Sequence, residues 1–247
     1  MDLYVYPIIL IVFAVIFTRE VIAPASQNHC DRRWLLLSTA LGASSGLIAV
    51  GIGYLFHGRI KTQALISLPD SLPDIAVGFL GFFCTSVIFY WWHRATHRFD
   101  FLWRNIHQLH HSPLRIEALT AFFAHPLETV TATLISCFSS YILFGASEYA
   151  AAWALFFTGF FDLYLHSDTR SPKWLGYLIQ RPEMHRVHHA YGHHAQNYGL
   201  PIWDMLFGTW HNPDERVQQC GFDAPKAERI CDMLRGQDVH RTVPSPC

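Results

Sequence analysis

Long apolar runs, separated by polar or charged segments, organise the first two thirds of the chain. The second run has 23 residues and the third has 18, both without a charge. A helix needs roughly 20 apolar residues, with a range near 17–25, to cross a bilayer. The second and third runs meet this requirement, the fourth and fifth are borderline, and the first is short. The pattern predicts an all-α, polytopic transmembrane helical bundle of about four to five spans: Leu3–Thr18, Trp34–Phe56, Ile75–Trp92, Leu127–Gly145 and Tyr149–Leu165.

The composition agrees with a membrane protein. Of the 247 residues, 51% are apolar and 15% are charged, whereas a typical soluble domain has about 25% charged residues. A soluble helical protein would have to bury all five runs in one small core. The formal net charge of −1 creates no field that attracts polyanions, so we expect no nucleic-acid partner. An acidic residue, Asp2, precedes the first run, which disfavours a cleaved signal peptide.

The basic residues predict the orientation. With five spans and the residues after Trp92 in the cytoplasm, every Lys and Arg except Arg59 and Lys61 is cytoplasmic, as the positive-inside rule requires. The polar C-terminal part then forms a cytosolic helical cap. We divide the chain into N-terminal transmembrane helices and loops (1–74), a central domain (75–211) and a C-terminal cytosolic tail (212–247). An ER-retrieval tail is not evident, which favours a bacterial inner membrane.

The chain has 16 histidines, and most of them fall into clusters. His93 and His97 are four residues apart, which places both rings on one face of a helix. HQLHH (107–111) and HRVHH (185–189) share the offsets 0, 3 and 4, so each set of rings falls within roughly a 100° arc. Neutral imidazole is a common metal ligand, and helices that present such arcs to one another enclose a metal. We expect structural roles for the isolated histidines, which are His29, His57, His211 and His240, and assign no ligand role to His193 or His194.

Local signals predict how the clusters meet. A straight helix from His93 to His111 would separate its ends by about 27 Å, too far for a shared site. We therefore expect a turn near Phe99–Phe101, with Asp100 as the N-cap of the next helix. Start and stop signals, a proline and a glycine, predict one short helix over Pro182–Tyr191.

The motifs around these histidines resemble those of the fatty acid hydroxylase/sterol desaturase superfamily, which comprises integral-membrane, histidine-rich di-iron enzymes. The resemblance covers about half of the chain and is specific to the superfamily, not to one substrate. It rests on the segments WHRATHR (92–98), LWRNIHQLHHS (102–112), AFFAHPLE (121–128), LHSD (165–168), PEMHRVHH (182–189), NYG (197–199) and WDMLFGT (203–209).

The resemblance implies a set of metal ligands, and no catalytic residue separate from the metal centre. The matching ligand positions are His93, His97, His107, His110, His111, His166, His185, His188 and His189. Asp162 precedes His166 by four residues, where the 2-hydroxylase branch has a second histidine. Candidates for a metal ligand, or for a residue that supports one, are His125, Asp162, Glu128, Asn197 and Asp204.

The resemblance also implies two iron ions as cofactor and O2 as co-substrate, because an unactivated C–H bond needs an oxidant that no side chain supplies. Zinc is an alternative occupant in purified protein, since affinity alone does not select iron. We expect a lipid substrate that arrives from the bilayer, and a separate electron-donor protein of the cytochrome b5 or ferredoxin type.

We favour hydroxylation of the lipid, with lipid or sterol desaturation at the same site as the alternative. A metal transporter is the alternative from another class. It would place its histidines near the membrane midplane, whereas these clusters lie outside the predicted spans.

Overall fold

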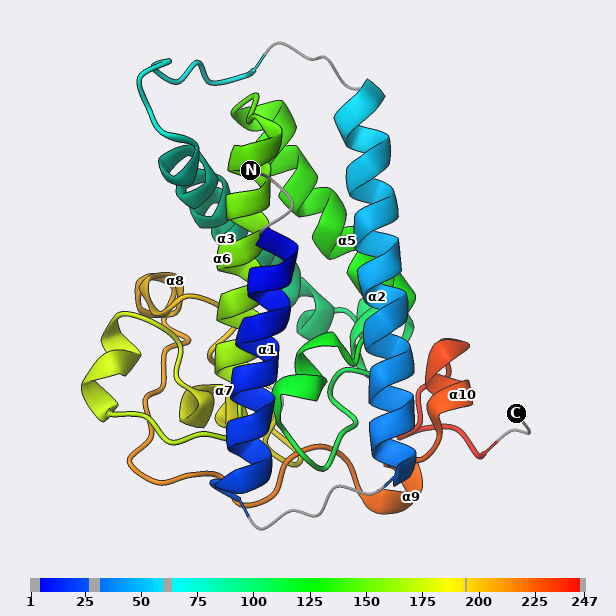
Figure 1. Cartoon of the computed structure of the whole chain (residues 1–247). Helices are drawn as coiled ribbons and strands as arrows, with labels where there is room; N and C mark the ends of the chain where they lie inside the picture. Colours follow the sequence, from blue (N-terminus) through cyan, green and yellow to red (C-terminus); the bar gives the residue numbers. More distant parts are fainter. Residues whose placement is uncertain (1–4, 27–31, 60–63, 194, 245–247) are drawn as a thin grey trace.

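The computed structural model describes residues 5–26, 32–59, 64–193 and 195–244, and within these ranges it contains helices but no β-strand. The prediction of an all-α protein is therefore confirmed. The long helices form an elongated bundle (Figure 1): α1 (Val5–Ile22), α2 (Arg32–Arg59), α3 (Asp74–Arg98), α5 (Pro126–Cys137) with its π-helical continuation η4 (Phe138–Leu143), and α6 (Glu148–His166).

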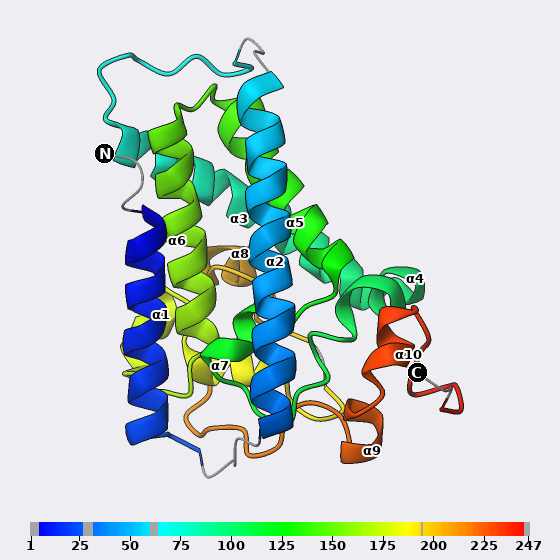
Figure 2. The same ribbon diagram turned by 45° about the vertical axis from the view of Figure 1, so that its right-hand side comes forward.

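Shorter helices gather toward one end of this bundle, and we call this part, residues 99–125 and 167–244, the cap (Figure 2). An apolar core formed by Leu109, Phe222 and Met233 holds the cap against the first turns of α2, where Trp34 and Leu37 pack on it. The cap contains α4 (Asp100–Leu102), η2 (Trp103–His107), η3 (Ala118–Phe122), η5 (Lys173–Tyr177), α7 (Pro182–His188), α8 (Pro201–Leu206), α9 (Ala224–Ala227) and α10 (Ile230–Leu234).

Helices α3 and α6 approach each other closely at Gly78. A Cβ atom at this position would lie 2.5 Å from the Cβ of Trp153 and 2.6 Å from the carbonyl oxygen of Ala150, so only glycine fits without a shift. The packed pair brings the last turns of both helices, which carry His93 and His166, to the same end of the bundle.

Buried polar contacts fix α1 and α2 on the cap. Glu20 of α1 is fully buried and accepts hydrogen bonds from the backbone N–H of Ala118 (3.0 Å) and Asp168 (2.6 Å). Trp34 of α2 donates its indole N–H to Glu117 (2.5 Å).

Two described helical stretches, Arg32–Phe56 and Asp74–Arg98, are long and apolar enough to cross a membrane. They contain the second and third predicted spans. The total of four to five spans, the three-domain division and the cytosolic position of the cap stay predictions. Some residues named above lie outside the described part of the chain: Leu3, His29, Lys61, His194 and the side chain of His57.

The turn between the first two histidine clusters lies where the sequence predicts it. Helix α3 ends at Arg98, Phe99 has an extended backbone (φ −106°, ψ 117°), and α4 begins at Asp100. The N-cap is Phe99, so the prediction that Asp100 caps the next helix is wrong by one residue. Helix α7 ends at His188, three residues before the predicted end.

Candidate metal centre

Nine histidine side chains converge beside the ends of α3 and α6. They form two sets, and within each set the potential ligand atoms lie within 4.8 Å of one another. The first imidazole group consists of His93, His97, His107, His111 and His188, and the second consists of His110, His166, His185 and His189. These are the nine predicted ligand positions. The structure brings all of them together, and metal binding by them stays a prediction.

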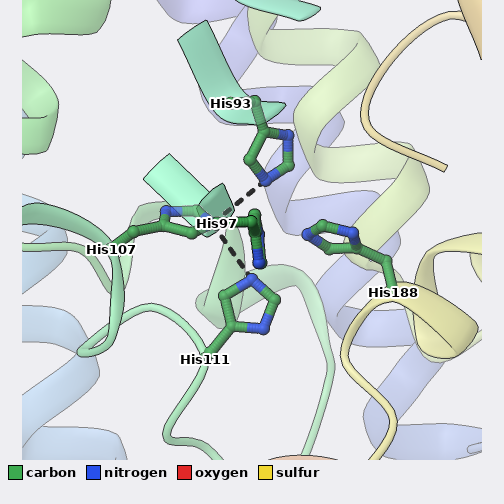
Figure 3. A group of neighbouring side chains, drawn as sticks. All are labelled: His93, His97, His107, His111 and His188. Atoms are coloured by element: carbon green, nitrogen blue, oxygen red, sulfur yellow. Dashed lines mark hydrogen bonds between the residues drawn. The ribbon is translucent and has the colours of Figure 1, made fainter. Parts of the chain in front are cut away.

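The rings of the first imidazole group point toward one another from three segments (Figure 3). His93 and His97 belong to consecutive turns of α3, His107 and His111 to the segment that follows α4, and His188 to α7. The Nε2 atom of His107 lies 3.0 Å from Nε2 of His93 and 3.0 Å from Nε2 of His111.

The second imidazole group joins α6 to α7 and to the segment after η2. The Nε2 atom of His166 lies 3.2 Å from Nε2 of His110 and 2.9 Å from Nε2 of His185. The Nε2 atoms of His185 and His189 are 3.0 Å apart.

Hydrogen bonds on the far side of the rings show where their protons lie. Nδ1 of His166 lies 2.9 Å from the carbonyl oxygen of Asp162, and Nδ1 of His110 lies 3.3 Å from that of Phe123. A carbonyl oxygen only accepts, so Nδ1 of each neutral ring carries the proton and Nε2 presents a lone pair.

In this tautomer, the lone pairs of His110 and His166 face each other across 3.2 Å with no hydrogen between them. Two such lone pairs repel each other unless a cation lies between them. Metal–nitrogen bonds of about 2.1 Å would place neighbouring ligand atoms roughly 3.0–3.4 Å apart, which agrees with the Nε2–Nε2 distances of 2.9–3.2 Å in this group.

The first imidazole group shows the same arrangement. Nδ1 of His93 lies 2.7 Å from the carbonyl oxygen of Tyr198, and Nδ1 of His188 lies 2.8 Å from that of Gln196. The lone pair on Nε2 of His188 therefore points into the group, where this buried atom has no hydrogen-bond partner. Both groups thus have the donor set of a metal site.

Burial keeps the imidazoles in the neutral form that binds metal. It lowers the pKa of His110 to about 4. Burial, with neighbouring imidazoles as a second cause, also holds the pKa values of four other cap histidines well below the usual range: His111, His185, His188 and His189. Protons therefore compete little with a metal ion at neutral pH.

Glu128 supports the first imidazole group from α5. Its Oε1 atom lies 2.6 Å from Nδ1 of His107, and both side chains are buried. A carboxylate that accepts from the far nitrogen of a ligating histidine fixes the orientation of the ring and raises its basicity. Among the five candidates for ligand or supporting roles, Glu128 makes a side-chain contact with a predicted ligand.

Asn197 and Asp204 hold the loop between α7 and α8. The Asp204 carboxylate accepts from the backbone N–H of Tyr198 (2.8 Å), and the Asn197 side chain donates to the carbonyl of Met184 (2.9 Å). Both residues therefore act on the site through the backbone.

The acceptors of the histidine Nδ1 protons are functional groups that the sequence did not predict, because a backbone carbonyl carries no residue-type signal. These carbonyls belong to Phe123, Gln196 and Tyr198.

His125 and Asp162 lie outside both imidazole groups. His125 is the N-cap of α5: its Nδ1 accepts from the backbone N–H of Leu127 (3.1 Å), and its Nε2 lies 3.2 Å from the carbonyl of Leu234. Both ring nitrogens are thus engaged elsewhere. Asp162 contacts His166 through its backbone carbonyl.

Each HxxHH cluster serves both imidazole groups. His107 and His111 join the first group while His110 joins the second, and in 185–189 the assignment is reversed. The spacing alone predicts that the three rings of each cluster lie within one arc, and it does not divide them between two groups. In the structure, the rings at i and i+4 share a group, and the ring at i+3, on the other edge of the arc, turns to the neighbouring group.

A cavity of about 560 Å³ opens beside the first imidazole group. His97, Trp103 and Phe222 line it, together with charged residues of the C-terminal segment. Two of these form ion pairs: Arg241 with Asp100 (2.9 Å), and Lys226 with Asp223 (2.5 Å). His97 is the one ring of the nine that is not buried, so the cavity leads from the outside to a predicted ligand.

Known proteins are similar to this chain over the region that contains both imidazole groups. A family model described as fatty acid hydroxylase matches residues 78–209. The ornithine lipid hydroxylase OlsE of Rhizobium tropici is 32% identical over 179 residues, which are 67% of this chain and 53% of that protein. Human alkylglycerol monooxygenase is 31% identical over 135 residues (52% and 29%). A very-long-chain aldehyde decarbonylase of Oryza sativa subsp. indica is 31% identical over 146 residues (55% of each).

The chain thus spans only about half, or less, of the length of these relatives. No solved structure matches it.

Proposed function

The chain belongs to the fatty acid hydroxylase family, and from this membership we propose that it is a membrane-bound lipid hydroxylase that uses O2 and two iron ions held by the imidazole groups. The matched relatives are named as a lipid hydroxylase, a monooxygenase and an aldehyde decarbonylase, all oxidoreductases. The observation that carries the proposal is the convergence of nine imidazoles in sets of five and four.

The nitrogen-only donor set suits iron, and it suits zinc as well, so family membership is what favours a redox metal. When bound, a redox metal pair with O2 supplies the oxidising power that an unactivated C–H bond requires.

The residues of this chain would bind the metal ions, orient the imidazole rings and shield the site from water. The carbonyls of Tyr198 and Asp162 hold the Nδ1 protons of His93 and His166, which directs the Nε2 lone pairs inward. Glu128 orients His107 and adds negative charge beside a cation. Burial of eight of the nine rings excludes water, which limits side reactions of a strong oxidant.

We propose that the lipid reaches the site from the bilayer, because both imidazole groups adjoin the ends of α3 and α6. Hydroxylation is favoured over desaturation, since two of the relatives are named as a hydroxylase and a monooxygenase. A separate cytochrome b5- or ferredoxin-type protein would supply electrons. We place the site on the cytoplasmic face of a membrane, with a bacterial inner membrane favoured over the ER.

Lipid profiling tests the proposal. The full chain, the double variant His185→Ala/His188→Ala and the control variant His240→Ala are expressed in a host that lacks the protein. We expect an O2-dependent lipid, heavier by one oxygen atom, in cells with the wild type and the control but not with the double variant. Loss of two hydrogen atoms would instead indicate desaturation. An unchanged lipid profile with altered cellular metal content would replace the proposal by a metal transporter.

A further inference from the structure

An apolar surface lies on the flank of the cap, where α8, η5 and one turn of α3 adjoin. We call it the flank surface. Its residues are large, apolar or aromatic, and between 44% (Met205) and 71% (Leu178) exposed. They are Trp91, Trp174, Tyr177, Leu178, Ile202, Met205 and Leu206.

Helix α8 packs on the part of α3 that is able to cross a membrane. Trp203 donates its indole N–H to the Ser86 hydroxyl (2.9 Å), and its ring centroid lies 5.0 Å from that of Phe83. Phe207 packs on Trp91 with 4.7 Å between ring centroids. Ser86 and Phe83 lie within the apolar stretch Asp74–Arg98. The outward side of α8 is therefore at the level of a predicted span.

The position of α8 in the fold agrees with this level. In both views α8 lies nearer to the middle of the long bundle than α7, α9 and α10 do (Figures 1 and 2). The two views are related by a rotation about the vertical axis, so the difference in height is a property of the fold.

We propose that the flank surface is immersed in the interfacial region of the bilayer, so that α8 and η5 form a membrane-dipping element on the cap. Helix α8 is amphipathic: Trp203 and Asp204 point to the protein, whereas Ile202, Met205 and Leu206 point outward. Interfacial helices bury such an apolar face about 5–10 Å into the headgroup and acyl boundary.

The composition of the flank surface identifies a lipid as the occupant. None of its seven residues is charged, and its two tryptophans and one tyrosine are the residue types enriched at membrane–water interfaces. The guanidinium of Arg94 lies 5.4 Å from the Trp91 ring centroid, as expected where a cation reaches toward headgroups beside an aromatic anchor. Trp91 of the flank surface belongs to the stretch of α3 that is long and apolar enough to cross a membrane, so the surface adjoins a predicted span.

The membrane-dipping element connects to the candidate metal centre. Asp204 of α8 holds the backbone N–H of Tyr198, and the carbonyl of Tyr198 accepts from His93. Contact of α8 with lipid therefore positions a loop that orients a predicted ligand. The immersion itself does not rest on the proposed function, because it requires neither metal nor turnover.

Photo-crosslinking in phosphatidylcholine vesicles tests the proposal on the full chain. The photoreactive residue p-benzoylphenylalanine replaces Leu206 or Leu178 in the flank surface. It also replaces Leu47 of α2, an exposed position inside the other membrane-competent stretch, and Leu234 of α10, an exposed position on the cap. We expect irradiation to add the mass of a phospholipid at Leu206, Leu178 and Leu47, and not at Leu234.

Lipid capture at Leu47 without capture at Leu206 and Leu178 would overturn the proposal. A covalent dimer through Leu206 would overturn it too, in favour of a contact between two copies of the chain. Both readouts are independent of lipid oxidation, so failure here is distinguishable from failure of the proposed function.

Discussion

His111 and His189 stack face to face, with 4.1 Å between ring centroids and 17° between ring planes. One ring belongs to the first imidazole group and the other to the second. The two groups are therefore mechanically coupled, because a shift of either ring displaces its neighbour. Loss of one group should weaken metal binding by the other as well.

We predict about two metal ions per chain in the wild type, since nine imidazoles exceed what one four- to six-coordinate ion needs. His166→Ala/His185→Ala removes half of the second imidazole group and should leave about one ion. His93→Ala/His188→Ala should do the same for the first group. Elemental analysis of folded, detergent-solubilised protein measures this, with His240→Ala as the control. Equal metal content in the wild type and both double variants would contradict the two-site interpretation.

Glu128→Ala should lower metal affinity by about 10–100-fold, the loss typical for removal of a carboxylate behind a histidine ligand. Glu128→Gln should lose less, because the amide oxygen still accepts from Nδ1 of His107 but carries no charge. Competition with a chelator at fixed pH measures both. The control is Glu215→Gln, which changes an exposed glutamate of the cap. Unaltered affinity in both Glu128 variants would remove Glu128 from the site.

Much of the candidate site could be predicted because side-chain identity and spacing carry its main signal. The offsets in HRATH, HQLHH and HRVHH predicted the histidine clusters, and the family resemblance selected from the clustered histidines the nine imidazoles, His166 included, that converge in the structure. A buried neutral imidazole requires a partner for its lone pair. A metal ion accepts the lone pairs of several imidazoles at once, which few other partners do.

Other features could not be predicted, because they depend on tertiary packing. Helical periodicity gives the angle between the rings of His107 and His110. It does not give the side on which the other rings of the second imidazole group pack against His110. The Nδ1 acceptors are backbone carbonyls, such as those of Tyr198 and Gln196, which every residue type offers. The contact of α8 with α3 could not be predicted either, since it depends on how Trp203 packs against Phe83 and Ser86.

Gly78→Ala should destabilise the protein by about 1–3 kcal/mol, the usual cost of overpacking. The new methyl group would meet Trp153 and the backbone of Ala150, which forces α3 and α6 apart. Gly46→Ala is the matched control, because nothing lies within 4 Å of its added Cβ. There, helix propensity should stabilise by up to about 1 kcal/mol. Thermal unfolding in one detergent compares the two, and equal midpoints would contradict the close α3–α6 contact.

Glu20 should make stability fall as pH rises from about 4.5 to about 7. Burial raises the pKa of Glu20 from 4.5 to about 7, although two backbone hydrogen bonds act in the opposite direction. The folded state then holds a proton that the unfolded state has released, so the free energy of unfolding decreases with pH in this window.

Glu20→Gln removes this titration and keeps an oxygen that accepts from the N–H of Ala118 and Asp168. The unfolding midpoint of the variant, relative to wild type, should therefore rise between pH 4.5 and pH 7. The exposed-site variant Glu215→Gln should show no such trend. A difference between Glu20→Gln and wild type that is constant with pH would show that Glu20 does not titrate in this window.

Asp162→Ala should leave both metal content and lipid oxidation at wild-type levels. The sequence alone makes the Asp162 carboxylate a candidate for the metal shell, because it lies four residues before His166. In the structure, the contact to Nδ1 of His166 comes from the Asp162 carbonyl at 2.9 Å, and alanine keeps that carbonyl in the same helix. Asp162→His should be tolerated for the same reason. A loss of metal in Asp162→Ala that Asp162→Asn restores would show that the side chain, and not the backbone, holds His166. Elemental analysis and chelator competition on the three variants decide between these two arrangements, with His166→Ala as the reference for a lost ligand.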